Sequence, residues 1–319
     1  MSKQSGAEKK SVFKDQRVLL GIVIIAIIAV VSFINPKFIA VKNMITILQQ
    51  ISVTGILTMA MSILLIGGGV DLSIGNLMVL AGVSMAELIS LGYSVPVAVL
   101  AGIAVGIVGG LLNGVIIARS KCIPLIITLG TSQVFYGLAL TISGGRIMSF
   151  DGAFNFIGKT KICGIFPVML FVLAIVIAVS YIIMNYTKFG RRLTCIGGNE
   201  KTAFLSGINV VRYKTMMYGI AGLYCAIAAI VFSSRIDSIT ANAGSGYETN
   251  ALTAAIIGGV TFDGGKGTIT GAFLGCILMG VISNAMNILK VETYVQTIIT
   301  GIIIVCAVVL SNYNNIKRS

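Results

Sequence analysis

The chain has 319 residues, of which 56% are hydrophobic and only 10% charged, and its mean hydropathy is +1.01. Soluble domains carry roughly 25% charged residues to cover their surface, so this composition excludes an ordinary soluble protein and indicates a chain solvated by lipid. The chain contains no His, which removes the commonest metal ligand and the commonest near-neutral acid–base group. We therefore expect neither a metal site nor a catalytic centre.

Ten apolar runs have about the length that crosses a ~30 Å hydrocarbon core at 1.5 Å per residue. The third is interrupted by Gly75 and Asn76, and the eighth is only about 13 residues long and rich in glycine. Both are predicted to be broken or re-entrant, which requires protein or water around the backbone. The sequence thus predicts an all-α integral membrane protein with about ten transmembrane helices, at residues 18–34, 45–66, 72–91, 95–118, 123–142, 165–184, 216–234, 250–262, 268–289 and 293–310.

The positive charges predict the orientation of these spans. With the N-terminus in the cytoplasm and ten alternating spans, 16 of the 23 Lys and Arg residues fall inside. Positive loops stay in the cytoplasm, so we expect residues 1–17 and 311–319 to be cytoplasmic tails of a transmembrane domain at 18–310. The bias also explains much of the net charge of +13 without a nucleic-acid partner. The outside residues are Lys37, Lys42, Arg146, Lys159, Lys161, Arg235 and Lys290.

Residues 113–130 (NGVIIARSKCIPLIITLG) resemble residues 284–301 (NAMNILKVETYVQTIITG), 171 positions later. Each segment has an Asn, a cation six residues on, and an apolar run that ends in Gly. Two five-helix halves related in this way would have opposite orientations, which is the inverted-repeat plan of many transporters. Two apolar segments also match this well by chance, so both interpretations stay open.

The longest polar stretch on the predicted cytoplasmic side covers residues 185–214 (NYTKFGRRLTCIGGNEKTAFLSGINVVRYK). Asn199 is a good N-cap, and Gly207 can end a helix in the left-handed conformation. We expect a helix of about two turns with Ala203, Phe204 and Ile208 on one side. So short a helix is unstable alone. The stretch is therefore either a solvated loop or a protrusion that fits a cytoplasmic partner.

The segment GRRLTCIGGNEKTAFLSGI within this stretch resembles the cytoplasmic coupling loop of the ribose-type permease family of ABC importers. Residues 47–61 (ILQQISVTGILTMAM), 67–82 (GGGVDLSIGNLMVLAG) and 244–275 (GSGYETNALTAAIIGGVTFDGGKGTITGAFLG) are similar to the same family. The four motifs occur in order along nearly the whole chain. The resemblance implies an ATPase-coupling role for Gly197, Gly198, Asn199, Glu200, Ala203, Phe204, Leu205, Ser206 and Gly207.

By this resemblance the chain is a permease subunit of the bacterial cytoplasmic (inner) membrane, paired with a second copy or a related permease. Two separate ATPase subunits, which bind ATP and Mg²⁺, would grip residues 185–214. An extracytoplasmic binding protein would deliver a monosaccharide, with ribose or a similar pentose favoured over a hexose. Transport would follow alternating access, with no cofactor and no covalent chemistry in this chain.

Several polar residues within or near the spans are candidates for the pathway or gate. An aspartate inside the membrane costs roughly 2.5–3.5 kcal/mol on insertion scales. Asp71 therefore either caps the third helix through N–H groups near Ser73 or lines the pathway. Amide side chains in spans either bridge helices or bind sugar hydroxyls. The candidates are Asp71, Ser73, Asn76, Asn113, Asn284 and Asn287.

Two further segments have alternative interpretations. Tyr247 and Glu248 lie at the predicted outer mouth, where they contact a docked binding protein or where Glu248 simply caps the eighth helix. The run 258–268 (GGVTFDGGKGT) does not fit a phosphate-binding loop, because Val260 stands where a Gly is needed and Gly267 follows Lys266. ATP binding is therefore expected on a separate subunit.

Other function classes fit less well. An ion-coupled secondary sugar transporter usually needs intramembrane carboxylates or histidines, and only Asp71 and Glu87 are placed for that role. A membrane-bound transferase needs paired carboxylates, a metal or an activated nucleophile, and the ten acidic residues show no DxD spacing. The cysteines form no CxxC pair and are interpreted as small apolar fillers: Cys122, Cys163, Cys195, Cys225, Cys276 and Cys306.

Overall fold

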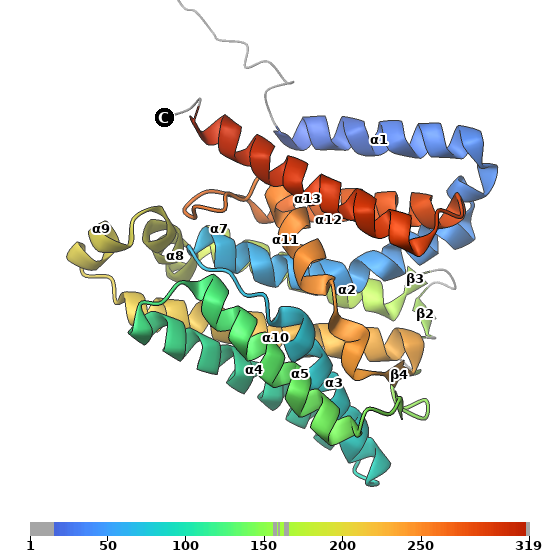
Figure 1. Ribbon diagram of the computed structural model, residues 1–319, viewed down its shortest axis with the longest axis horizontal. Helices are drawn as coiled ribbons and strands as arrows, with labels where there is room; N and C mark the ends of the chain where they lie inside the picture. Colours follow the sequence, from blue (N-terminus) through green and yellow to red (C-terminus); the bar gives the residue numbers. More distant parts are fainter. Residues whose placement is uncertain (1–15, 156–157, 159, 163–165, 317–319) are drawn as a thin grey trace, which may run out of the picture.

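The computed structural model describes residues 16–155, 158, 160–162 and 166–316, and most of these lie in helices (Figure 1). Most of the predicted N-terminal tail, the last three residues of the C-terminal tail, Lys159 and Cys163 lie outside the described residues. The elements are α1 (Gln16–Ile34), η2 (Pro36–Ile39), α2 (Val41–Ile66), α3 (Ile74–Ser90), α4 (Val95–Ser120), α5 (Pro124–Ser143), β1 (Met148–Ser149), β2 (Lys161–Ile162), β3 (Phe166–Pro167), α7 (Val168–Tyr186), α8 (Lys188–Gly198), α9 (Glu200–Leu205), α10 (Val210–Ile236), β4 (Ser238–Ile239), η3 (Ala241–Gly244), α11 (Tyr247–Ile257), α12 (Ile269–Ile288) and α13 (Thr293–Ile316).

A helix lies at each of the ten positions predicted for a span. Among the described residues, seven helices are long and apolar enough to cross a membrane: α1, α2, α4, α5, α7, α10 and α12. Helix α3 is an apolar helix of 17 residues and α11 has only 11. The chain is therefore an all-α, multi-span fold, and the number of spans beyond seven stays a prediction.

The break in the third span lies earlier than predicted. Helix α3 runs without interruption through Gly75 and Asn76, and the irregular backbone covers residues 67–73. Gly75 serves close packing instead, because a Cβ atom there would lie 2.4 Å from the carbonyl oxygen of Gly244. The eighth span ends at Ile257, since Gly259 adopts a left-handed φ of 87°, which terminates helices readily.

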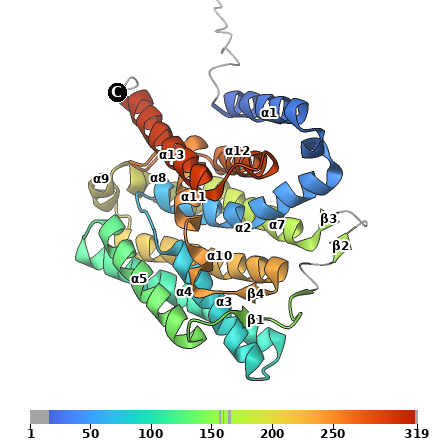
Figure 2. The ribbon, with the colours of Figure 1, turned by 45° about the vertical axis from the view of Figure 1, so that its right-hand side comes forward.

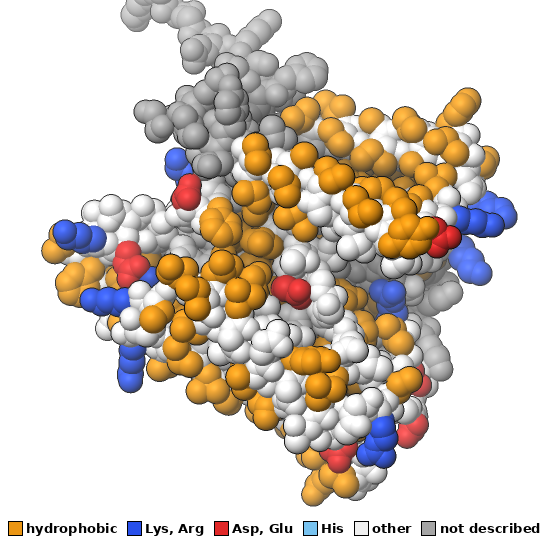
Figure 3. All heavy atoms as spheres, viewed as in Figure 1, with side chains coloured by type: hydrophobic (Ala, Val, Ile, Leu, Met, Phe, Trp, Pro, Cys, Tyr) orange, Lys and Arg blue, Asp and Glu red, His pale blue; other side chains and the backbone are white. Residues whose placement is uncertain are grey.

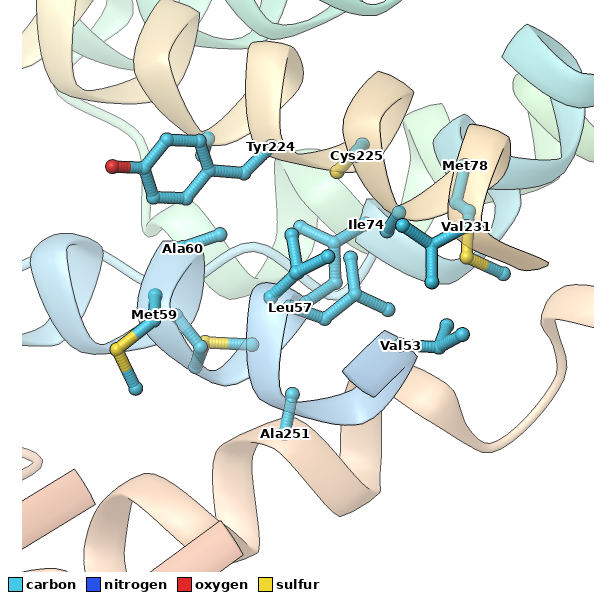
Figure 4. Close-up of a cluster of buried hydrophobic side chains, with 14 of the residues drawn as sticks. Val53, Leu57, Met59, Ala60, Ile74, Met78, Tyr224, Cys225, Val231 and Ala251 are labelled. Carbon is cyan, nitrogen blue, oxygen red and sulfur yellow. The ribbon is translucent and has the colours of Figure 1, made fainter. Parts of the chain in front are cut away.

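Helices α2, α3 and α10 form the centre of the bundle. In the most apolar window of α2, 78% of the residues are buried, compared with 17% in α1. Figure 4 shows Leu57 of α2, Ile74 of α3 and Val231 of α10 gathered in this core, with Ala251 of α11 beside them. Helices α1, α4, α5 and α7 keep large apolar side chains on their outer faces, as lipid contact requires.

Helix α4 packs closely along α10 through small residues. A Cβ atom at Gly222 of α10 would lie 2.1 Å from the carbonyl oxygen of Gly106 of α4. Such contacts let helix backbones approach in a bilayer, where hydrophobicity does not drive helices together. Part of the glycine content of the sequence, 38 residues, serves such close contacts.

Helices α10 and α2 each contact a group of helices, and the two groups pack in similar ways. Helix α3 packs on α4, α5 and α10, whereas α11 packs on α12, α13 and α2. Helix α4 in turn packs on α10, and α12 on α2. The neighbours of α3 thus correspond to those of α11, whereas the packing of α1 on α12 and of α7 on α2 has no equivalent among the described residues of the first group.

Charged side chains gather at the two ends of the long axis, with hydrophobic side chains across the face between them (Figure 3). Helix α13 ends toward the side of the view where α8 and α9 lie, and α1 begins nearer to that side than it ends (Figures 1 and 2). The two short antiparallel pairs lie toward the opposite end, with Met148 opposite Ile239 and Ile162 opposite Phe166.

Candidate functional site

The polar stretch between α7 and α10 contains two helices, where the sequence predicted one. The predicted helix is α9, and its predicted caps are present. The Oδ1 atom of Asn199 accepts a hydrogen bond from the backbone N–H of Thr202 at 2.9 Å, and Gly207 has a φ of 79°. Helix α7 ends at Tyr186 and α10 begins at Val210, so the ends of the predicted 185–214 stretch lie within these two helices.

Helix α8 was missed by the prediction, although the sequence carries signals for it. The hydroxyl of Thr187 caps its N-terminus by accepting from the N–H of Gly190 at 3.2 Å. Its buried residues Gly190, Leu193 and Ile196 recur at helical spacing and pack against the bundle, while its cations stay exposed. Helices α8 and α9 together form a protrusion at one end of the long axis (Figure 1), which we call the α8–α9 segment (residues 188–205).

The α8–α9 segment has a small apolar core of its own. The prediction that Ala203 and Phe204 share one side of the helix is wrong, because successive helix residues are about 100° apart around the axis. Ala203 is buried, whereas Phe204 is 67% exposed and Leu205 is 75% exposed. These two large apolar side chains therefore project from the protrusion. The core consists of Ile196, Ala203 and Val210, with Ile208 and Tyr213 packed against it.

Polar contacts hold the α8–α9 segment to the first turns of α10. The ammonium of Lys214 pairs with the carboxylate of Glu200 at 2.5 Å. The guanidinium of Arg192 donates to the Tyr213 hydroxyl at 2.5 Å and lies 5.5 Å from the centre of its ring. Exposed ion pairs add only about 0–1 kcal/mol each, so these contacts mainly fix the orientation of a segment already held by its apolar core.

Three glycine-containing segments meet where the α8–α9 segment joins the bundle, and we call this meeting the glycine junction (residues 66–69, 197–198 and 264–265). A Cβ atom at Gly197 would lie 2.0 Å from the carbonyl oxygen of Ile66 and 2.7 Å from the nitrogen of Gly265. The N–H of Gly265 donates to that same carbonyl at 2.9 Å. The end of α8, the end of α2 and the turn before α12 therefore touch directly through backbone atoms, and the Leu193 side chain of α8 also lies against Gly67.

The glycine junction leads directly into a buried polar cluster around Asp71. One carboxylate oxygen of Asp71 accepts from the backbone N–H of Ser73 at 2.7 Å and from its hydroxyl at 2.5 Å. The amide of Asn113 donates to the other carboxylate oxygen at 3.1 Å and to the Ser73 hydroxyl at 2.9 Å. The hydroxyl of Tyr218 donates to the carbonyl of Val70 at 2.9 Å. The cluster thus caps α3 and ties the break before it to α4 and α10.

The remaining candidate pathway residues lie at separate helix pairs. The amide of Asn76 donates to the Ser132 hydroxyl at 2.9 Å, which joins α3 to α5. Asn284 and Asn43 exchange two hydrogen bonds, at 2.9 and 3.1 Å, which join α12 to α2. Asn287 accepts one at 3.0 Å from a side chain of α13. Each of these contacts is of the helix-bridging kind.

Tyr247 and Glu248 are half-buried where α11 begins. The carboxylate of Glu248 accepts from the N–H of Gly246 at 3.1 Å, and a Cβ atom at Gly75 of α3 would lie 2.5 Å from its other oxygen. The ring of Tyr247 packs edge-on against Phe232 at 6.1 Å between centres. Both residues therefore lie against neighbouring helices, and their role in docking a binding protein stays a prediction.

The chain matches known proteins over nearly its whole length. Residues 43–308 match a family described as a permease component of branched-chain amino acid transport systems. The chain is 36% identical to the ribose import permease protein RbsC of Bacillus subtilis (strain 168) over 91% of its own length and 90% of that protein. The chain belongs to this permease family. No solved structure matches the permease significantly.

Two other relatives are also named as permeases of sugar transport systems. The permease is 35% identical to the L-arabinose transport system permease protein AraH of Escherichia coli (strain K12), over 97% of its own length and 95% of that protein. It is 34% identical to the D-allose transport system permease protein AlsC of the same strain, over 89% and 88%. Family membership and the seven membrane-capable helices make the permease a multi-pass protein of the bacterial cytoplasmic membrane.

Proposed function

We propose that this permease is the membrane-spanning subunit of an ATP-driven importer that carries a monosaccharide into the cell. The named relatives transport ribose, L-arabinose and D-allose, and their similarity covers nine-tenths of the chain. A pentose is therefore the first substrate to test and a hexose the second. The family description refers to amino acids, but the individual relatives favour sugars.

The observation that carries the ATP-driven mechanism is the α8–α9 segment. Its exposed Phe204 and Leu205 offer an apolar contact that a partner's groove would bury. A fully buried large apolar side chain contributes roughly 1.5–3 kcal/mol. In this proposal two cytoplasmic ATPases, each with bound ATP and Mg²⁺, grip these segments in the two permease subunits of a homo- or heterodimer.

In this proposal the glycine junction transmits movement of the α8–α9 segment to the helix bundle. Movement of α8 acts on Ile66 at the end of α2, because backbone atoms touch there without an intervening flexible side chain. The same movement then displaces residues 67–73, the non-helical segment that contains Asp71. Asn113 hydrogen-bonds to Asp71 and Tyr218 to Val70, so the displacement also reaches α4 and α10. Alternating access would be the motion of these helices around a central path.

The orientation and symmetry belong to the same proposal. The end of the long axis that carries the α8–α9 segment would face the cytoplasm, with both termini, and a binding protein would deliver sugar at the opposite end. The corresponding neighbours of α3 and α11 support two inverted five-helix halves, in line with the sequence echo between residues 113–130 and 284–301.

An ion-coupled secondary sugar transporter is the alternative. Coupling by an intramembrane carboxylate needs oxygens that a cation or proton can reach. Both oxygens of Asp71 are engaged by Ser73 and Asn113, and the side chain is buried. This arrangement supports a structural capping role for Asp71 and favours the ATP-driven proposal.

A crosslinking experiment tests the coupling role of the α8–α9 segment. Phe204→Cys is introduced in a Cys195→Ser background, because Cys195 is an exposed native thiol nearby. We expect a crosslink to the co-expressed ATPase whose yield changes with ATP, and none from Tyr93→Cys, an exposed residue that follows α3 on the proposed outer side. No crosslink at Phe204→Cys, together with sugar uptake driven by a proton or sodium gradient, would contradict the proposal.

A further inference from the structure

A half-open cavity of about 270 Å³, with polar and apolar lining in similar shares, lies between α2, the end of α10, the start of α11 and α12. A water molecule takes up ~30 Å³ in the liquid, so the cavity holds roughly nine waters or one small solute. No predicted pathway residue lines it. Its polar lining residues are Gln50, Thr54, Arg235, Ser245, Tyr247, Asn250 and Ser283.

The hydrogen-bonding capacity of this lining is largely unused. The Oε1 atom of Gln50 is buried and accepts no hydrogen bond from any described residue. Arg235 forms no ion pair within the part of the chain that the structure describes. A buried acceptor left unpaired is costly, and a guanidinium is a strong donor for pairs of oxygens. A ligand rich in hydroxyl groups would satisfy both, because a hydroxyl donates to the Gln50 oxygen and accepts from the guanidinium.

An aromatic side chain forms part of the same wall. Tyr247 lines the cavity and is held in place by its edge-on contact with Phe232. Small-molecule sites combine an apolar or aromatic surface with a few fixed polar groups. The polar groups here are amides, hydroxyls and one guanidinium, all of which pair well with hydroxyl groups.

The position of the cavity fits a solute that enters from one side. Gln50 lies nine residues after the start of α2, which is about 14 Å from that end of the helix at 1.5 Å per residue. Cys276 lies twelve residues before the end of α12, which is about 18 Å from that end. The cavity therefore reaches about the middle of a ~30 Å hydrocarbon core. From Gly55 to Ile66 every residue of α2 is buried, so the path narrows there toward the α8–α9 end.

The charge of the lining discriminates between ligand classes. An amino acid carries an ammonium and a carboxylate, and binding both needs an anionic and a cationic partner. The lining has one cation, Arg235, and no carboxylate. This composition suits a neutral polyhydroxylated solute better than the branched-chain amino acids that the family description mentions.

We propose that this cavity is a transit site that holds one monosaccharide in the outward-open permease, with Gln50, Arg235 and Asn250 binding its hydroxyl groups beside Tyr247. The proposal rests on the proposed function, because it takes the cavity side as the extracytoplasmic side. The site is distinct from the Asp71 cluster and from the α8–α9 segment.

The first test compares two neighbouring glutamines in the assembled transporter. Gln50→Leu removes the hydrogen-bonding groups at nearly constant size, and Gln49→Leu is the matched control, since Gln49 does not line the cavity. Initial uptake of radiolabelled D-ribose, L-arabinose and D-allose is measured in cells with the ATPase and binding protein present. We expect Gln50→Leu to lower uptake of the transported sugar about tenfold or more and Gln49→Leu to leave it near wild type.

A second measurement keeps the proposal testable if Gln50→Leu folds poorly. Ser283→Cys in a Cys276→Ala background is labelled from outside with a small thiol reagent, and label at residue 283 is quantified by peptide mass spectrometry. The transported sugar should slow labelling several-fold, while L-leucine should not. Labelling unaffected by the sugar, or slowed by L-leucine instead, would overturn the site.

The outcomes separate the site from the proposed function. If the wild-type transporter takes up none of these sugars, the proposed function fails and the site fails with it. If wild-type uptake is normal while Gln50→Leu and Gln49→Leu behave alike and the sugar gives no protection, only the transit site is overturned.

Discussion

Gly197→Ala is the change that isolates the glycine junction. Gly197 and Gly198 are neighbours in the last turn of α8, and alanine is a better helix former than glycine by up to ~1 kcal/mol in a helix interior. The two substitutions therefore give similar local gains. They differ in space: a Cβ atom at Gly198 meets nothing within 4 Å, whereas one at Gly197 meets three backbone atoms at 3.0 Å or less.

The size of the perturbation follows from these distances. The added Cβ atom would lie 2.0 Å from the Ile66 carbonyl oxygen, and real Cβ contacts are essentially never shorter than 3.0 Å. The end of α8 and the end of α2 must therefore separate by at least about 1 Å, and neither partner is a flexible side chain. Overpacking of this kind costs roughly 1–3 kcal/mol, which is as large as a typical coupling free energy between two sites.

The assay measures sugar uptake and ATP hydrolysis by the assembled transporter. We expect Gly197→Ala to lose most sugar uptake while the ATPase still binds and hydrolyses ATP, because the contact between α8 and α2 is altered and Phe204 is not. Gly198→Ala should stay near wild type in both activities. Equal uptake by the two variants, at equal expression and thermal stability, would refute the role of the glycine junction.

Three further changes test other parts of the account. Phe204→Ser removes an exposed apolar side chain, so it should weaken binding of the ATPase in a pull-down by about 1 kcal/mol or more. The melting temperature of the permease should stay unchanged. A lower melting temperature would instead show that Phe204 stabilises the fold of the permease itself. Asp71→Ala removes the acceptor of the Ser73 N–H and hydroxyl and one of the two acceptors of the Asn113 amide. Each unpaired buried group costs about 1–3 kcal/mol, so thermal stability in detergent should drop clearly. Asn284→Leu should cost less, about 1 kcal/mol. Asn43→Leu combined with it should lose less than the sum of the two single changes, because the first change already breaks the pair and only the bond from Asn43 to the Phe38 carbonyl remains to be lost. Fully additive losses in melting temperature would contradict this.

The membrane-spanning architecture was predictable because it depends on local composition. Apolar runs of span length give helices wherever they occur, and the cap signals at Asn199 and Gly207 correctly marked the ends of α9. The shortness of the eighth apolar run also predicted the short helix α11. The location of the third break was not predictable, because Gly75 looks like a helix breaker in the sequence and is in fact a packing surface for Gly244.

The site was predictable only where its residues are close in sequence. Asp71 and Ser73 are two positions apart, so their capping interaction follows from the local pattern. The meeting of residues 66–69, 197–198 and 264–265 depends on how distant helices pack, which one sequence does not reveal. The cavity near Gln50 was missed for the same reason, since its lining comes from four helices and glutamine in a span has no distinctive signal.

The energy source of transport is the most direct test of the central claim. The permease is reconstituted in proteoliposomes with its ATPase and its binding protein, and accumulation of the radiolabelled sugar is followed with and without ATP. The account predicts accumulation that requires ATP and persists when proton and sodium gradients are collapsed. Accumulation that proceeds without ATP and stops when those gradients are collapsed would contradict it.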